Sequence, residues 1–193
     1  THIEEDYVLL MKDDPNDKDE EYKLRSSLNG APAGFDPTEG FNKPISAIHV
    51  PVPQYKERLQ FSMHKFFNRL TPQDLWERHN WSIQTHDQRF ATRENYNHAY
   101  EGEKVREIGY EEIDFDNSSF LRVERQILTR MPVLGAIVMS VRTYLTPLKQ
   151  IKAEGLGFEL AEAIDGLPED LAWYKRRAAW GAATKMYLRG ERN

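Results

Sequence analysis

The chain has 193 residues, of which 39% are hydrophobic and 30% are charged, and it contains no cysteine. Chains of this length usually form one domain, so we expect a single domain over residues 1–193. The lack of cysteine excludes disulfides, iron–sulfur clusters, cysteine-ligated zinc or haem, and a thiolate nucleophile on this chain. A net charge of -5 disfavours nucleic acid as the main partner.

No stretch of the sequence resembles a membrane span of roughly 18 consecutive apolar residues, and the N-terminus lacks the pattern of a signal peptide. We therefore expect a soluble, cytoplasmic protein without a membrane partner. The sequence begins at Thr1 in the middle of an amphipathic run, which indicates a fragment or a processed chain.

The N-terminal quarter of the chain contains one helical and one extended pattern. Apolar residues at helical spacing predict a short helix over residues 3–11. A charged loop follows, and then a predicted strand over residues 21–28. Residues 29–44 are rich in Gly, Pro and Asn, which predicts a loop with repeated turns.

His49 precedes the run Val-Pro-Val-Pro over residues 50–53. Because proline fixes its own backbone and restricts the residue before it, we expect a stiff, extended segment that holds the imidazole in one orientation. The alternative is an ordinary, partly buried histidine. The next segment, residues 55–70, carries an apolar stripe that predicts a core-facing helix ending before Pro72.

The second half of the chain begins with extended patterns and ends with helical ones. Residues 76–84 predict a strand, and residues 101–116 form an acidic segment that we expect on the surface. The runs 121–130 and 136–145 predict a hairpin joined by Met-Pro-Val-Leu-Gly. Helical patterns follow to residue 188, so the order of elements predicts an α+β fold with an antiparallel sheet.

The register of the hairpin decides which side chains meet. Pairing Arg130 with Ala136 across the loop places Glu124 opposite Arg142, with Tyr144 on the same face. If this face is exposed to solvent, Glu124 and Arg142 form a routine surface pair of little energetic value. If it lines a cavity, a carboxylate, a guanidinium and a phenol converge on a ligand.

The common nucleotide-binding, zinc-protease and hydrolase motifs are absent from the sequence. There is no P-loop, dinucleotide fingerprint, zincin motif or nucleophile elbow. None of the six histidines is followed by another four residues later, so a paired metal site on a helix has no support. A single axial ligand for a cofactor remains open, and His49 is the candidate.

Four motifs in combination resemble the alpha subunit of the haem-dependent oxidative N-demethylase family. They are Ile48-His-Val-Pro-Val-Pro53, Asn80-Trp81, Leu121-Arg-Val-Glu-Arg-Gln126 and Val141-Arg-Thr-Tyr144. Family members usually have an additional N-terminal stretch, and Arg125-Gln-Ile-Leu-Thr-Arg-Met-Pro132 departs from the common family pattern.

The resemblance implies a PAS-like fold in which an antiparallel sheet and flanking helices enclose haem b, with a histidine on the iron. It implies NADPH-dependent oxidative demethylation of a small amine such as dimethylamine, a monooxygenase-type reaction with O2. Electrons would come from a separate reductase subunit that carries flavin and an iron–sulfur centre.

Matching positions give the residues expected at the site. His49 is the expected ligand of the haem iron. The other expected residues are Arg122 and Trp81 at the cofactor, and Glu124, Arg142 and Tyr144 in the catalytic pocket. The alternative is a non-catalytic PAS-like sensor of haem or another small ligand, and a third reading is an interaction domain without a cofactor.

Overall fold

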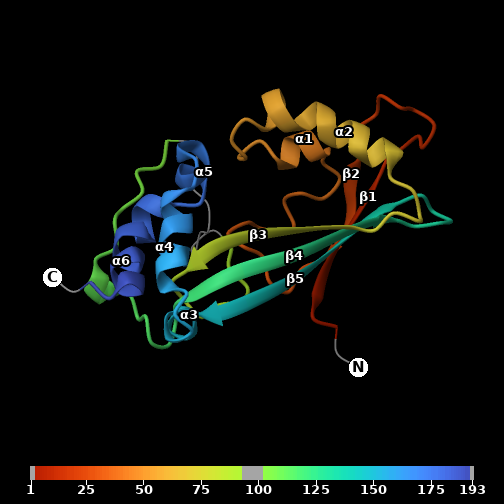
Figure 1. Ribbon diagram of the computed structural model, residues 1–193. Helices are drawn as coiled ribbons and strands as arrows, with labels where there is room; N and C mark the ends of the chain where they lie inside the picture. Colours follow the sequence, from red (N-terminus) through yellow and green to blue (C-terminus); the bar gives the residue numbers. More distant parts are fainter. Residues whose placement is uncertain (1–2, 93–101, 192–193) are drawn as a thin grey trace.

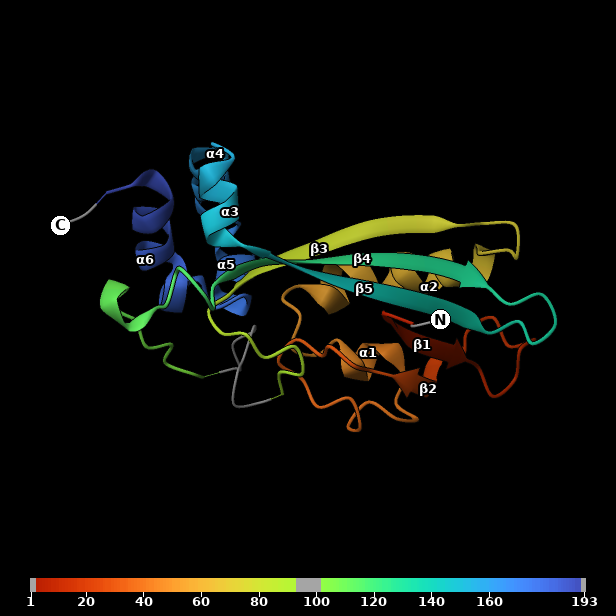
Figure 2. The ribbon, with the colours of Figure 1, turned by 90° about the horizontal axis from the view of Figure 1, so that it is seen from below.

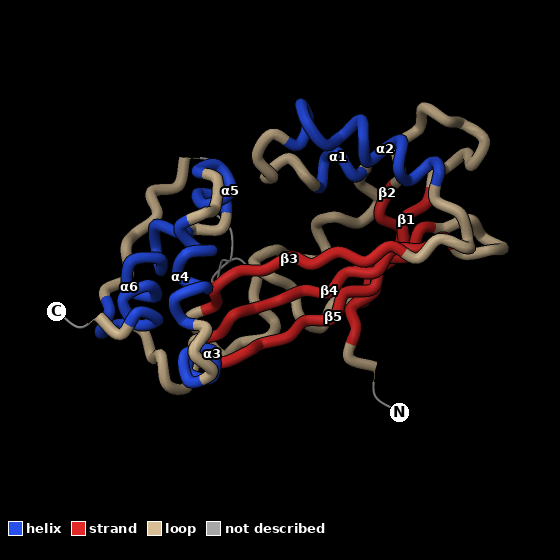
Figure 3. Tube along the Cα trace, viewed as in Figure 1, coloured by secondary structure: helices blue, strands red, loops and turns tan. Residues whose placement is uncertain are grey.

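The computed structural model describes residues 3–92 and 102–191 (Figure 1). Its centre is a five-stranded antiparallel sheet with the order β2-β1-β5-β4-β3. Helices lie at both ends of the long strands (Figure 3), which confirms the predicted α+β fold with flanking helices. The strands are β1 (Glu5–Met11), β2 (Lys23–Leu28), β3 (Trp76–Gln84), β4 (Phe120–Arg130) and β5 (Ile137–Pro147).

The helices form two groups. An N-terminal group covers one face of the sheet, and a C-terminal group packs at the end where β3 and β5 finish (Figures 1 and 2). No helix in the described part of the chain is long and apolar enough to cross a membrane. The helices are α1 (Ile45–Ile48), the π-helix η1 (Tyr55–Leu59), α2 (Gln60–Arg69), the 3-10 helix η3 (Tyr110–Glu112), α3 (Leu148–Ala153), α4 (Gly157–Asp165), α5 (Glu169–Tyr174) and α6 (Arg177–Arg189).

The predicted helix over residues 3–11 is wrong, because this segment forms strand β1. Its residues pair with two neighbours, so that Tyr7 lies opposite both Leu28 of β2 and Ser140 of β5. Leu10 is buried in the core beneath α2. Pairing on both edges outweighs a helical spacing that spans only nine residues.

The extended segment predicted after His49 is also wrong. His49 caps the end of α1 with φ -92° and ψ 9°, and two turns follow through bonds to the carbonyls of His49 and Val52. Gln54 adopts the left-handed region at φ 56° and starts η1. Proline fixes φ near a value that turns also use, so the prolines here stiffen a compact turn. The helix predicted over 55–70 is confirmed as η1 and α2.

The hairpin of β4 and β5 is confirmed, but its predicted register is wrong by one residue. Arg130 pairs with Ile137, because the carbonyl of Ala136 accepts the Met131 N–H at 2.8 Å inside the loop. Gly135, at φ +65°, makes this closure without a side-chain clash. A shift of one residue moves every side chain of one strand to the other face relative to its partner strand.

Two apolar cores hold the sheet. One lies beneath α2 and includes Phe67, Leu128 and Ile137. The other lies among the C-terminal helices and contains Ile113 and Phe115, which are 7% and 6% exposed. The surface position predicted for residues 101–116 is therefore wrong for this apolar pair. Between the two cores, the middle of the sheet carries polar side chains.

Candidate functional site

The face of the sheet that α2 covers becomes polar between α2 and α5. We call its middle part the polar face, formed by alternate residues of two paired strands. It comprises Arg78, Asn80 and Ser82 of β3 and Arg122, Glu124 and Gln126 of β4. An open hollow with a volume of about 50 Å³ lies here, lined among others by Asn80, Ser82, Arg122, Glu124, Tyr174 and Lys175.

Arg122 forms the buried floor of this hollow and is only 1% exposed. Its guanidinium donates to Glu124 Oε1 at 3.2 Å, to Gln84 Oε1 at 3.3 Å and to Thr143 Oγ1 at 3.3 Å. A further bond reaches the carbonyl of Ala31. The side chain of Arg122 thus connects strands β3, β4 and β5 with the loop that follows β2.

Glu124 presents a carboxylate to the hollow from a side chain that is 13% exposed. One oxygen accepts from Arg122, and the other accepts from Gln126 at 3.2 Å. A carboxylate has about four acceptor positions, and these two bonds occupy two of them. Glu124 can therefore still accept a hydrogen bond from an N–H group of a ligand. The two bonds fix its orientation before a ligand arrives.

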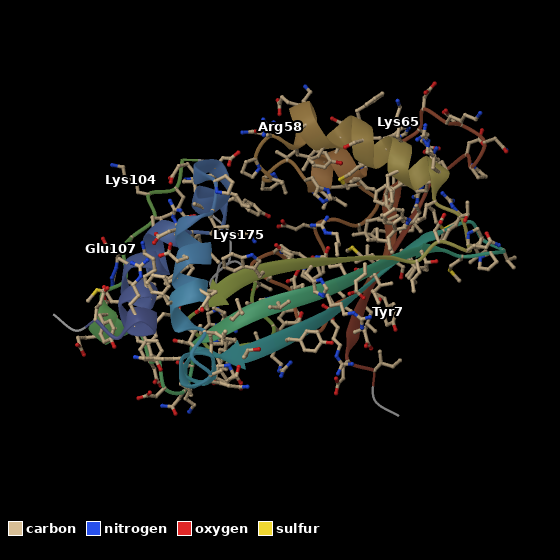
Figure 4. All side chains as sticks on the ribbon, viewed as in Figure 1. Tyr7, Arg58, Lys65, Lys104, Glu107 and Lys175 are labelled. Atoms are coloured by element: carbon tan, nitrogen blue, oxygen red, sulfur yellow. The ribbon has the colours of Figure 1, made fainter. Side chains whose placement is uncertain are left out.

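Lys175 reaches the free edge of β3 from the end of α5 and is 6% exposed. Its Nζ donates to Asn80 Oδ1 at 2.8 Å and to the carbonyl of Trp81 at 2.5 Å. The indole of Trp180 donates to the carbonyl of Lys175 at 3.0 Å and holds the turn between α5 and α6. In Figure 4 the lysine lies on the polar side of β3, whereas Tyr7 lies beyond the other side of the sheet.

Burial lowers the pKa of the Lys175 ammonium from 10.5 to about 8, while Glu124 raises it and Arg78 lowers it further. The unfolded chain therefore binds more protons than the folded one between pH 8 and pH 10.5, so stability must rise with pH in this window. From pH 7 to pH 9.5 this linkage adds about 2 kcal/mol to the free energy of unfolding.

Urea unfolding at both pH values measures this effect. We expect the wild type to gain about 2 kcal/mol relative to Lys175→Met as the pH rises. Lys185→Met, which removes a surface partner of Asp165, serves as the control and should track the wild type. A pH-independent difference between the wild type and Lys175→Met would show that Lys175 stays charged throughout.

His49 lies at the end of α1, in the N-terminal helix group. Its Nδ1 bonds the carbonyl of Ile45 at 2.9 Å, and its ring stacks on Tyr55 with centroids 4.7 Å apart. An Nδ1–H donated to a carbonyl leaves Nε2 as the unprotonated nitrogen, and within the described residues nothing bonds to Nε2. Burial lowers the pKa of the imidazole, the Ile45 bond opposes this, and Arg78 contributes to the lowering.

This arrangement is the one that a metal-ligating histidine needs. A neutral ring, oriented through Nδ1 and offering Nε2, is the usual state of an iron or zinc ligand. The donor chemistry of His49 therefore suits a residue that would hold a haem iron through Nε2. The described residues contain no group of three His, Asp or Glu side chains that could hold a bare metal ion.

A hydrogen bond connects the His49 segment to the C-terminal helices. Gln54 Nε2 donates to Asp170 Oδ2 of α5 at 2.7 Å. This bond links the turn after His49 to the helix that precedes Lys175. The hollow itself combines an oriented carboxylate and a buried amine, and the imidazole of His49 lies outside its lining.

Comparison with known families gives a match over residues 1–185 to the family described as "Haem-dependent oxidative N-demethylase, alpha subunit-like". The chain belongs to this family. The name implies dependence on haem and an alpha subunit that works with a partner subunit. No curated protein matches the chain.

In this family member, Arg142 and Tyr144 do not join the site. Arg142 lies opposite Arg125 on the other face of the sheet, where it pairs with Glu5 at 3.1 Å and with Glu4. Tyr144 shares that face and is 41% exposed. The predicted pairing of Arg142 with Glu124 is wrong, because Glu124 lies opposite a threonine in the observed register.

The sequence prediction did bring together part of the site. Arg122, Glu124 and Trp81 all line the hollow, whereas His49 ends α1 outside this lining. It missed Arg78 and Lys175. The only signal for Lys175 is its place in the basic C-terminal segment, which also suits an ordinary solvated helix.

Proposed function

We propose that this chain is a haem-binding catalytic subunit that removes a methyl group oxidatively from a small amine such as dimethylamine. The observation that carries the proposal is the Nε2 of His49, which is oriented through the bond of Nδ1 to the Ile45 carbonyl. Haem b, when bound, supplies the redox chemistry that amino-acid side chains lack. The family to which the chain belongs supports the same cofactor.

The overall reaction fits a chain without cysteine. One N-methyl group is oxidised and leaves as formaldehyde, one atom of O2 goes into that product, and the other is reduced to water. Two electrons come from NADPH. This chain has no cysteine to hold an iron–sulfur cluster, so the proposal assigns electron delivery to a separate reductase subunit.

Glu124 is the residue that we propose for substrate binding. Its carboxylate faces the hollow and suits the ammonium form of a small amine, which donates N–H bonds. Arg122 is a positioning residue, because it fixes one oxygen of Glu124 from below.

Haem binding tests the role of His49. Haemin is added to the purified chain and the Soret band is followed in the wild type, in His49→Ala and in His79→Ala. His79 is an exposed histidine on the opposite face of β3, so its variant should bind like the wild type. We expect His49→Ala to shift the Soret band and to weaken haem binding at least about tenfold.

Turnover tests the enzymatic part of the proposal. The haem-loaded chain receives dimethylamine, NADPH and an electron-transfer reductase, and formaldehyde is measured. Wild-type haem uptake that does not depend on His49 would contradict the proposed ligand. Haem uptake through His49 without formaldehyde would favour the sensor reading over the enzyme.

A further inference from the structure

The amine of Lys175 is a buried group that the proposed chemistry does not use. Lys175 ends α5 and lines the open hollow on the polar face (Figure 4). Within the part of the chain that the structure describes, its Nζ forms two hydrogen bonds but no ion pair, because the carboxylate of Glu124 pairs with Arg122. A lysine buried without an ion pair is rare, so its place beside a hollow points to a chemical role.

The hydrogen bonds of Lys175 suit its unprotonated amine. A neutral amine has two N–H groups and one lone pair, and Nζ has two acceptors, Asn80 Oδ1 at 2.8 Å and the Trp81 carbonyl at 2.5 Å. Both N–H groups are then satisfied, and the lone pair is left for a molecule in the hollow. Burial lowers the pKa of Lys175 to about 8, so about a tenth of the amine is unprotonated at pH 7, against less than about a thousandth for an ordinary lysine. Such an amine is a nucleophile at neutral pH.

The size and lining of the hollow limit what this amine can meet. A volume of about 50 Å³ admits a molecule of only a few non-hydrogen atoms. The lining is largely polar and includes Asn80, Ser82 and Glu124. A small aldehyde fits this space, and its carbonyl carbon is the electrophile with which lysine amines react reversibly. The carboxylate of Glu124, fixed by Arg122 and Gln126, is placed to stabilise the cation that such a reaction creates.

We propose that Lys175 forms a Schiff base with a small aldehyde that enters the hollow. The nitrogen attacks the carbonyl carbon, and one N–H proton moves to the aldehyde oxygen, which gives a carbinolamine. That oxygen takes a second proton from solvent and leaves as water, and a C=N bond remains as an iminium ion. The step consumes no oxidant or reductant, and water reverses it.

Formaldehyde is an aldehyde of this size, and the proposed demethylation releases it. For the identity of the aldehyde, this inference therefore rests on the proposed function. Lys175 lines the same hollow as Glu124, the residue proposed to bind the amine substrate. The Schiff base holds the product beside the place where it forms and slows its escape into solvent.

Reductive trapping tests the Schiff base. The purified chain, without haem, is incubated at pH 7 with formaldehyde and cyanoborohydride, which reduces an iminium ion to a stable methylamine. Peptide mass spectrometry then follows the methylation of each lysine. Lys149 of α3 is exposed and serves as the comparison within the same sample. We expect Lys175 to be methylated at least about tenfold faster than Lys149, and equal or slower methylation of Lys175 would overturn the proposal.

Two controls show whether the reactivity comes from the folded site. In concentrated urea the preference for Lys175 over Lys149 should disappear, and a preference that survives would overturn the proposal. The fast phase of methylation, seen in the mass of the whole chain, should be lost in Lys175→Arg and kept in Lys185→Arg, which changes a partner of Asp165. Thermal unfolding confirms that both variants are folded. A fast phase that persists in Lys175→Arg would assign the reactive amine to another residue.

The size of the aldehyde tests the role of the hollow. The same trapping is repeated with acetaldehyde and with benzaldehyde, whose ring is too large for a hollow of about 50 Å³. We expect Lys175 to keep its advantage over Lys149 with acetaldehyde and to lose it with benzaldehyde. An equal advantage with benzaldehyde would contradict a site for small aldehydes.

Failure of this inference and failure of the proposed function are distinguishable, because the trapping needs no haem. If the chain binds haem through His49 and produces formaldehyde but Lys175 is not selectively methylated, the Schiff base is wrong and the haem function stands. If Lys175 is selectively methylated but the chain takes up no haem, the aldehyde site stands, and the proposed function as the source of its aldehyde fails.

Discussion

Replacing Arg122 with methionine is expected to lower the free energy of unfolding by about 3–5 kcal/mol. The guanidinium is 1% exposed, and its loss leaves Glu124 without its ion-pair partner inside the structure. Acceptors on Gln84 and Thr143 lose their donor as well. A buried charge without a partner is among the most destabilising changes that a single substitution makes.

Urea denaturation of Arg122→Met measures this loss. The matched control is Arg125→Met, which removes an arginine from the same strand on the opposite face. Arg125 is 42% exposed and pairs with Glu77 at 2.7 Å, so its loss should cost less than about 1 kcal/mol. Equal effects of the two substitutions would show that the hydrogen bonds of Arg122 add nothing beyond a surface pair.

Replacing Gly157 with alanine is expected to cost about 3 kcal/mol of stability. Gly157 begins α4 where that helix meets the end of α6, and a Cβ placed there would lie 2.5 Å from the carbonyl oxygen of Leu188. That oxygen belongs to the backbone of α6, so the clash is relieved only if a helix moves. The C-terminal core between α4 and α6 would open with it.

Gly166→Ala is the matched control for this prediction, because it makes the same substitution at the other end of α4. A Cβ there would lie 3.4 Å from the Glu162 carbonyl, an ordinary contact, and φ is -73°. Thermal denaturation should show a large drop in melting temperature for Gly157→Ala and a small change of either sign for Gly166→Ala. A melting temperature of Gly157→Ala equal to that of the wild type would mean that α4 and α6 shift apart easily.

The two predictions concern the two ends of one scaffold. Arg122 connects the strands beneath the polar face through its hydrogen bonds. Gly157 sets the packing of α4 against α6, and Lys175 lies in the turn just before α6. His49 enters from the other end of the sheet on α1. The sheet therefore acts as a rigid base that holds separate pieces of the site at a fixed separation, which preorganised chemistry requires.

The sequence by itself determined the elements whose local pattern is strong. The strand over residues 76–84 and the helix over 55–70 appear where their periodicity predicts them. The hairpin follows from its Pro and Gly loop, and the family follows from its motifs. Each of these signals lies within a short window, where spacing and turn chemistry act directly.

Only the tertiary structure decided the register, the first strand and the assembled site. One hydrogen bond inside the hairpin loop, from Met131 to Ala136, moved Arg142 to the face opposite Glu124. Strand β1 exists because two neighbours pair with it. Lys175 and Asn80 are 95 residues apart in the chain, and no local pattern encodes a contact that two distant elements make only after folding.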